Sequence, residues 1–310
     1  MDRRRARARA LSSAALLLAG ASGGSSVPIR EARWLAPAGL YAGLSREPAE
    51  CLVEPRGAGQ RRAVAVGRIA FRAPLLLGGQ AARAGMSCAT CHRNGRGNAS
   101  FLFPGLSGAP GTADVTSSLM SSHRGDHVDN PKPIPDLGGP RAKLKISRDP
   151  KDGALEHFIH GLITEEFDGP EPAPEVLAGI AAYVRALRPE GCGSGERTIA
   201  LGERLGEVET AVRLAAASRR GTRQLLLAAA RSMLGAIDER FRLPGLERDR
   251  TLLAEADSDL RVLRAGGEDF GGWHRLWPER RKRLLADAPR SLYDPARLRI
   301  ALAGNIPPIR

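Results

Sequence analysis

Residues 85–92 read Gly-Met-Ser-Cys-Ala-Thr-Cys-His, and this stretch decides how the rest of the chain is interpreted. Cys88 and Cys91 stand three positions apart, so one turn of backbone can present both sulfurs to the two vinyl groups of a haem. His92 follows directly, and an imidazole there is the usual proximal iron ligand of the c-type attachment pattern. The sequence therefore predicts one covalent haem c on Cys88 and Cys91, with His92 bound to its iron.

Other chemistries also use paired cysteines. A structural zinc site needs four ligands, and Cys51 or Cys192 could complete a set, although neither has a partner at short spacing. A redox dithiol normally begins a helix in a βαβ context, which this chain lacks. The third alternative is an inert pair in a loop. Haem attachment is favoured because His92 follows the pair and because a secretory leader precedes it.

That leader is residues 1–21, which read as a signal peptide. Five arginines precede an apolar run over residues 10–19, and Ala19-Gly20-Ala21 supplies the small residues of a cleavage site. The run is about half the ~20 residues needed to cross a bilayer, and no later stretch is long and apolar enough. We expect a periplasmic or otherwise exported protein without a transmembrane segment in the mature chain.

The net charge of +13 falls to +9 when residues 1–21 are removed. A field of that sign favours acidic partners, and a haem protein needs an electron donor or acceptor. We therefore expect an acidic redox partner protein. No aromatic-interleaved basic patch or nucleic-acid motif is present, so nucleic acid is not expected as a partner.

Export also bears on the two remaining cysteines, because an oxidising compartment permits disulfides. After Cys88 and Cys91 are assigned to haem, Cys51 and Cys192 are the pair left. A disulfide between them would contribute ~4–5 kcal/mol by loop entropy. The alternative is two free buried thiols.

Apolar spacing predicts helices joined by long Gly/Pro-rich loops, and no convincing run of strands. We expect an all-α fold in which a c-type cytochrome-like haem domain is followed by a helical C-terminal domain, with a Gly-rich boundary near residues 189–195. The expected parts are a signal peptide (1–21), an N-terminal lead (22–47), the haem domain (48–192) and the C-terminal domain (193–310). The expected helices are 62–71, 154–167, 173–187, 197–217, 222–241 and 246–263, with a weaker pair at 275–286 and 294–303, interrupted by Pro278 and Pro289.

Residues 67–74 and 85–92 resemble the haem modules of bacterial di-haem cytochrome c peroxidases and the related methylamine-utilisation haem enzymes. Those modules share a helix with Gly and Phe, a loop, and then Ser-Cys-x-x-Cys-His. Residues 181–187 resemble the last helix of c-type cytochromes, and this resemblance implies that Tyr183 packs on Gly67. The family's peroxidases carry two haem motifs in one chain, whereas this chain has one.

The resemblance also raises the question of the sixth iron ligand. In the resembling electron-transfer modules a Met supplies it, and our alignment puts Leu162, which cannot bind iron, at that position. Either the sixth position is open or a ligand comes from the loop with Met120, His123 and His127. We favour His123, because the family keeps a distal-side His near this place and imidazole binds ferric iron better than a thioether.

Two other groups invite interpretation. Glu165, Glu166 and Asp168 could form an acid/base or calcium site, but a solvated helix end is the favoured interpretation. Trp273 and Trp277 could form a docking patch, but core anchoring is the more common role.

Three functions follow. The leading hypothesis is a monohaem cytochrome that takes part in electron transfer. The alternatives are a peroxidase-like haem enzyme that uses an external electron donor, and a haem-based sensor or scaffold whose C-terminal helices recognise a partner.

Overall fold

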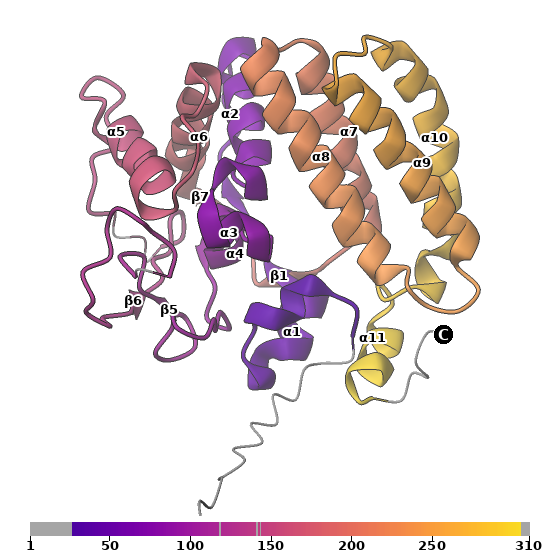
Figure 1. Ribbon diagram of the computed structural model, residues 1–310, viewed down its shortest axis with the longest axis horizontal. Helices are drawn as coiled ribbons and strands as arrows, with labels where there is room; N and C mark the ends of the chain where they lie inside the picture. Colours follow the sequence, from indigo (N-terminus) through magenta and orange to yellow (C-terminus); the bar gives the residue numbers. More distant parts are fainter. Residues whose placement is uncertain (1–26, 118, 141, 143, 305–310) are drawn as a thin grey trace, which may run out of the picture.

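The computed structural model of the chain describes residues 27–117, 119–140, 142 and 144–304. These residues are mostly helical, which confirms the expected all-α class (Figure 1). The expected signal peptide, residues 1–21, lies outside the described residues. No helix within the described part combines the length and the apolar character that crossing a membrane requires.

The α-helices, in chain order, are α1 (Leu40–Ser45), α2 (Ala58–Ala70), α3 (Gly79–Ala84), α4 (Cys88–Cys91), α5 (Ala154–Gly161), α6 (Pro174–Ala186), α7 (Leu201–Ala216), α8 (Arg220–Arg240), α9 (Glu247–Arg264), α10 (Phe270–Asp287) and α11 (Pro295–Leu302). Short 3-10 helices are η1 (Arg30–Trp34), η2 (Pro37–Gly39), η3 (Pro74–Leu76) and η5 (Ala288–Arg290), and η4 (Leu162–Glu166) is a π-helix. Short antiparallel ladders pair β1 (Arg46–Pro48) with β8 (Glu196–Thr198), β2 (Cys51–Leu52) with β7 (Leu187–Cys192), β3 (His92–Arg93) with β4 (Arg96–Gly97) and β5 (Thr112–Ala113) with β6 (Lys132–Pro133).

Helices α2 and α6 cross in backbone contact at a pair of glycines. A side-chain carbon added to Gly67 would lie 1.9 Å from the carbonyl oxygen of Gly179, so a larger residue cannot fit there without separating the helices. The resemblance implied that Tyr183 packs on Gly67; at this crossing the backbone nearest to Gly67 is that of Gly179. One turn further along both helices, the Tyr183 ring packs edge-on against Phe71, with the ring centroids 5.3 Å apart.

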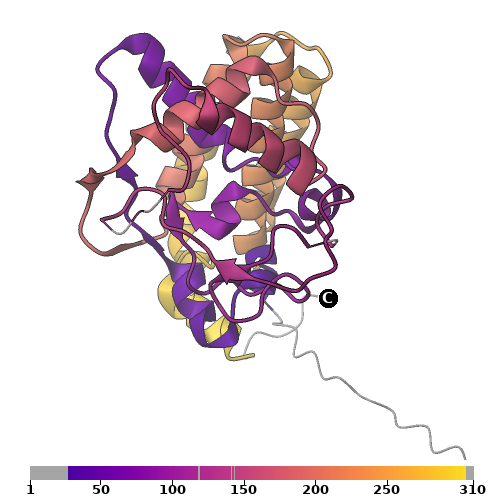
Figure 2. The ribbon, with the colours of Figure 1, turned by 90° about the vertical axis from the view of Figure 1, so that its left-hand side faces the viewer.

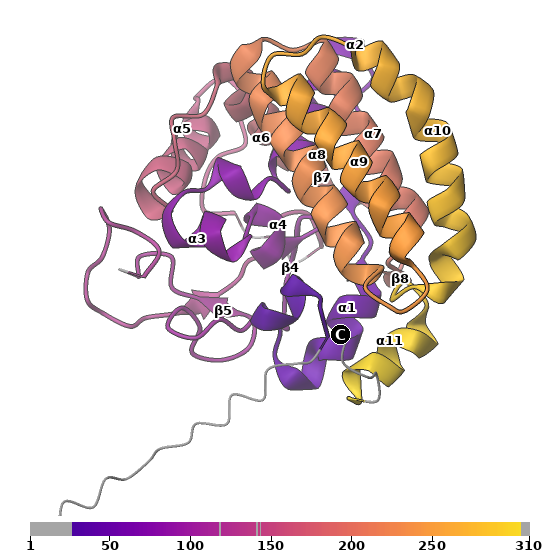
Figure 3. The ribbon, with the colours of Figure 1, turned by 45° about the vertical axis from the view of Figure 1, so that its right-hand side comes forward.

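The C-terminal helices α7 to α10 lie side by side, as Figure 3 shows. Helix α10 continues through Pro278, where the sequence suggested an interruption. Trp273 and Trp277 are both 2% exposed and stack with their ring centroids 4.7 Å apart, which confirms their expected role in the core.

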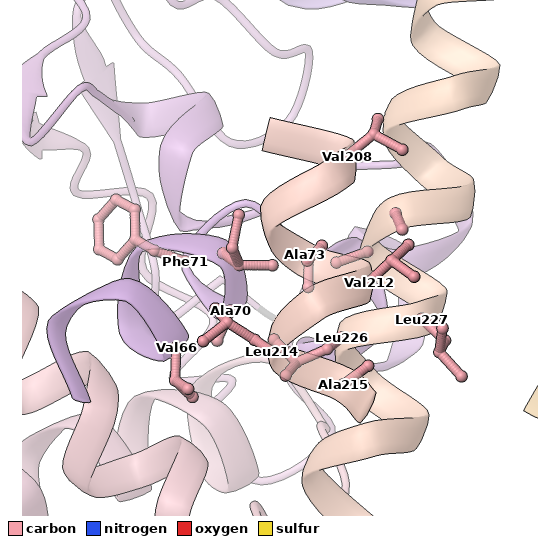
Figure 4. Packing of buried hydrophobic residues seen from close by; sticks show 14 of the residues in the cluster. Val66, Ala70, Phe71, Ala73, Val208, Val212, Leu214, Ala215, Leu226 and Leu227 are labelled. Atoms are coloured by element: carbon pink, nitrogen blue, oxygen red, sulfur yellow. The ribbon is translucent and has the colours of Figure 1, made fainter. Parts of the chain in front are cut away.

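The largest apolar core crosses the expected boundary near residues 189–195. It joins side chains of α2 and α6 to those of α7, α8, α9 and α10, and α2 contacts both α7 and α8. Figure 4 shows Val66 and Ala70 of α2 in one group of buried side chains with Val212 and Leu226 of the C-terminal helices. The expected haem and C-terminal domains therefore share one core, because each presents an apolar helix face that the other covers.

The expected N-terminal lead is also part of the folded body. Ile29 and Leu44 form a second cluster with Leu292 and Leu298, and α1 contacts α11 at the lower end of Figure 1. The first described residues thus pack against the last described helix.

The segment between α4 and α5 consists mostly of loops and lies on the face seen in Figure 2. The helix expected over residues 154–167 changes its winding at Leu162, where the π-helix η4 replaces regular α-helix. Asp152, expected near its N-cap, accepts a hydrogen bond from the Ala154 N–H at 2.9 Å, while Gly153 is the N-cap residue.

Candidate haem site

Cys88 and Cys91 lie on α4, a single helical turn whose start is fixed by a capping box. The Ser87 side chain accepts from the N–H of Thr90, and Oγ1 of Thr90 accepts from the N–H of Ser87 at 3.0 Å. The N–H of Ala89 donates to the carbonyl oxygen of Phe71 at 3.0 Å, which ties the turn to the end of α2. Both cysteines are therefore held on one defined turn.

His92 follows this turn, and one hydrogen bond orients its ring. Nδ1 lies 3.0 Å from the carbonyl oxygen of Pro135. Because a carbonyl only accepts, Nδ1 carries the proton and Nε2 keeps its lone pair, which is the tautomer that a metal-binding imidazole needs. Burial lowers the pKa of His92 to about 4, so the ring is neutral near pH 7.

The Pro135 carbonyl is itself held by the loop around it. Asp136 accepts hydrogen bonds from the N–H groups of Gly138 and Gly139 at 3.0 and 2.7 Å, and it accepts from Arg96 at 2.7 Å. The loop that orients His92 is thus anchored to β4, four residues after the motif ends.

An apolar cluster borders both cysteines. The partly buried residues packed against it are Ala84, Cys88, Cys91, Phe103, Ile134 and Phe167. Its buried side chains are those of Trp34, Leu77, Ala81, Met86, Phe101, Leu106, Ala113 and Met120. The thiols therefore face a setting suited to an apolar macrocycle rather than to hydrated ions.

This setting argues against the competing cysteine chemistries. Burial raises the pKa of Cys88 and of Cys91 to about 12, whereas a redox dithiol needs a thiol that ionises readily. Cys51 and Cys192, the cysteines that could have completed a zinc site, form a disulfide, which is the pairing expected by elimination.

The candidates for the sixth ligand lie in one loop but differ in how deeply they are buried. Met120 is 1% exposed and belongs to the same apolar cluster as Cys91. The side chain of His123, the favoured ligand, is 62% exposed, and its Nε2 lies 3.9 Å from Asp168. His127 is exposed and adopts a positive φ of 60°. The structure directs Met120, not His123, into the apolar cluster.

The acidic residues expected at a solvated helix end divide into different environments. Glu165 is exposed and pairs with Arg124. Asp168 accepts from the N–H of Ser122 at 2.9 Å, which fixes the loop after Met120. The Glu166 side chain is 13% exposed and its Oε2 is buried without a hydrogen-bond partner among the described residues. Burial raises the pKa of Glu166.

A buried charge network lies on the other side of the motif. The Tyr183 hydroxyl donates to Glu50 at 2.6 Å, and Arg68 donates to the same carboxylate at 2.8 Å. Arg72 donates to the side-chain oxygen of Asn94 at 2.7 Å, two residues after His92. Burial acts to raise the pKa of Glu50, but Arg72 and Arg68 outweigh it and hold that pKa at about 2.

Two of these contacts have no local signal in the sequence. Pro135 lies 43 residues from His92 in a loop expected only to be ordered, and Glu50 lies 133 residues from Tyr183. No protein-family model, curated protein or solved structure matches the chain. The resemblance to c-type haem modules therefore rests on residues 67–74, 85–92 and 181–187.

Proposed function

We propose that this protein is an exported monohaem c-type cytochrome that transfers electrons between partner proteins. The observation that carries the proposal is the 3.0 Å hydrogen bond from His92 Nδ1 to the Pro135 carbonyl. It leaves Nε2 available for iron on the residue that directly follows Cys88-Ala-Thr-Cys91. Neither a redox dithiol nor an inert loop requires an imidazole oriented in this way.

The residues around α4 fit a covalent haem. Cys88 and Cys91 would hold it through thioether bonds, and His92 would bind its iron. A bound haem supplies a one-electron couple whose potential depends on axial ligands, hydrogen bonds and burial. The chain's own part is to keep water from the cysteine side with the apolar cluster and to hold the imidazole through Pro135.

We infer that Met120, rather than His123, is the sixth ligand. Met120 is buried in the cluster that borders Cys91, and a thioether is a common partner of His in electron-transfer haems. The His123 ring would have to leave Asp168 and become buried to bind iron. His/Met ligation gives a higher potential than the bis-imidazole ligation expected from His123.

A peroxidase-like enzyme remains the second candidate because of Glu166. Its carboxyl has a raised pKa and an unpartnered buried oxygen, which are the properties of a proton donor or acceptor. It lies next to Phe167 of the apolar cluster, and its other oxygen is 3.9 Å from Arg124 in the loop after Met120. Electron transfer is favoured because a Met120 ligand would fill the position that peroxide needs.

Two features support export and an acidic partner. The Cys51–Cys192 disulfide suits an oxidising compartment. The charge of +9 that remains after residues 1–21 would attract a protein of opposite sign.

The deciding experiment is expression with the signal peptide in a host that attaches haem c, followed by haem staining of denaturing gels. The wild type should stain, and the double variant Cys88→Ala/Cys91→Ala should not, because the thioether bonds need both sulfurs. Cys51→Ser/Cys192→Ser is the matched control, since it removes the same number of cysteines but should keep the stain. Equal staining of the Cys88/Cys91 double variant and the wild type would contradict the proposal.

A further inference from the structure

A cavity of about 210 Å³ lies behind the haem motif, between α4 and the C-terminal helix α8. Ser87, Ala89 and Thr90 of the motif line one wall, and residues near the end of α8 line another. Cys88 and Cys91, by contrast, border the apolar cluster. The cavity is thus distinct from the candidate haem site but shares the turn that carries its cysteines.

The charged groups around this cavity do not balance. Five arginines line it, namely Arg30, Arg72, Arg93, Arg204 and Arg240, together with four glutamates, Glu31, Glu47, Glu207 and Glu239. Four of the arginines have carboxylate partners: Arg30 binds Glu239, Arg93 lies 3.5 Å from Glu31, Arg204 binds Glu47, and Arg72 lies 3.6 Å from Glu207. The lining therefore carries one surplus positive charge.

Arg240 carries that surplus. It is 5% exposed, and no carboxylate pairs with it in the part of the chain that the structure describes. Its guanidinium donates to the carbonyl oxygens of Leu44 at 2.7 Å and Leu292 at 3.2 Å, and it lies 4.9 Å from the centre of the Tyr293 ring. A buried cation without a counter-ion is costly, and a bound anion would offset that cost.

The remaining lining and the size of the cavity define the kind of anion. Trp34, Met233 and Ile237 add apolar surface beside the arginines. A volume of about 210 Å³ is below the ~300–1,000 Å³ of drug-sized pockets, which favours a ligand smaller than a nucleotide. One surplus charge matches a carboxylate better than a phosphate, which carries up to about two negative charges at pH 7.

We propose that this cavity binds a small organic carboxylate with an apolar body, whose carboxylate pairs with Arg240 while its body lies against Trp34 and Met233. The lining arginines come from η1 (Arg30), the turn after α2 (Arg72), β3 (Arg93), α7 (Arg204) and α8 (Arg240). Since Ser87, Ala89 and Thr90 form one wall, the ligand would also brace α4.

The test is isothermal titration of the purified exported chain with benzoate, benzamide and inorganic phosphate. Benzoate should bind with one site per chain, and benzamide, its neutral counterpart of the same shape, should bind about tenfold or more weakly because it cannot make the charge-assisted contact. Phosphate should bind more weakly than benzoate because it has no apolar body.

Two variants locate the binding. Arg240→Met should weaken benzoate about tenfold or more, as expected for the loss of a hydrogen-bonded ion pair. Ala236→Trp should abolish binding, because the larger side chain fills the cavity from α8 while every arginine stays in place. It therefore tests the site even if Arg240→Met does not fold. Arg242→Met is the matched control, because Arg242 is 43% exposed, pairs with Asp238 and does not line the cavity.

The absence of saturable benzoate binding by the wild type would overturn the proposal. So would phosphate binding more tightly than benzoate, equal binding of benzamide and benzoate, or unchanged benzoate binding by Ala236→Trp. Covalent haem is measured separately by staining, so a failure here leaves the haem-staining result intact.

Discussion

The loop-rich segment between α4 and α5 and the C-terminal helices α7 to α10 are stabilised in different ways. In the C-terminal helices, apolar side chains at helical spacing pack against those of the next helix in the chain. In the loops, single long-range hydrogen bonds fix the backbone, such as His92 to Pro135 and Arg148 to the carbonyl oxygen of Leu187 at 2.6 Å. Many similar apolar contacts thus stabilise the C-terminal helices, whereas a few specific hydrogen bonds position the residues of the candidate site.

Among the variants that test this difference, the one without the disulfide should lose the most stability. Cys51 and Cys192 are separated by 141 residues, a span that includes the Cys88-Ala-Thr-Cys91-His92 motif and the loops after it. We expect Cys51→Ser/Cys192→Ser to lower the free energy of unfolding by ~4–5 kcal/mol, because the unfolded chain gains loop entropy. Urea unfolding followed by circular dichroism measures the loss.

Hydrogen exchange on the same variant sharpens the comparison. The loss of amide protection should be concentrated between residues 92 and 150, and helices α8 and α9 should change less. Reduction of the wild type with dithiothreitol is the control and should reproduce the effect. Uniform loss across both regions would show that the loops and the helices are not stabilised separately.

The same difference explains what the sequence could predict. Helix α8 was expected over 222–241 and spans Arg220–Arg240, because its periodicity is local. The Cys88-Ala-Thr-Cys91-His92 motif also lies within five consecutive residues. The exposure of His123 and the burial of Met120 could not be foreseen, because both depend on contacts with residues about 46 positions away, such as Asp168 with Ser122. The shared core could not be foreseen for a related reason, since the faces of α2 and α7 that cover each other are far apart in the sequence.

A spectrum of the haem-loaded protein would test whether one residue of the loop-rich segment, Met120, has a specific role as an iron ligand. Met120→Leu keeps an apolar side chain of similar volume, so it should cost less than ~1.5 kcal/mol of stability. If Met120 binds the iron, Met120→Leu should convert a low-spin haem to a high-spin one, as judged by the ferric absorption or resonance Raman spectrum.

His123→Ala is the paired variant. Its side chain is 62% exposed, so the substitution should change stability by no more than ~0.5 kcal/mol and leave the spectrum as it is. A high-spin shift in His123→Ala, with an unchanged spectrum in Met120→Leu, would return His123 to the ligand position. A wild type that is already high-spin would favour the peroxidase-like alternative.

The smallest expected change in stability comes from a buried, unpartnered carboxylate within the C-terminal helices. Asp249, in the first turn of α9, is 1% exposed, and neither of its carboxylate oxygens has a hydrogen-bond partner among the described residues. The nearest cation is Arg283, with Nε 3.6 Å away. Burial raises the pKa of Asp249 above 3.8, and the charge of Asp287 raises it further.

A raised pKa means that the folded state keeps the Asp249 proton at pH values where the unfolded chain has already lost it. The folded state then binds more protons, so this group's contribution to stability falls as the pH rises from about 4 through the folded pKa.

Asp249→Asn cannot ionise, so it should match the wild type below about pH 4 and exceed it in stability at pH 7. Urea midpoints across that range measure the difference. Asp257→Asn is the control, because Asp257 is 34% exposed and pairs with Arg231 at 2.7 Å. A lower stability of Asp249→Asn at pH 7 would mean that the ionised carboxylate stabilises this end of α9, and that the C-terminal helices also depend on a specific polar contact.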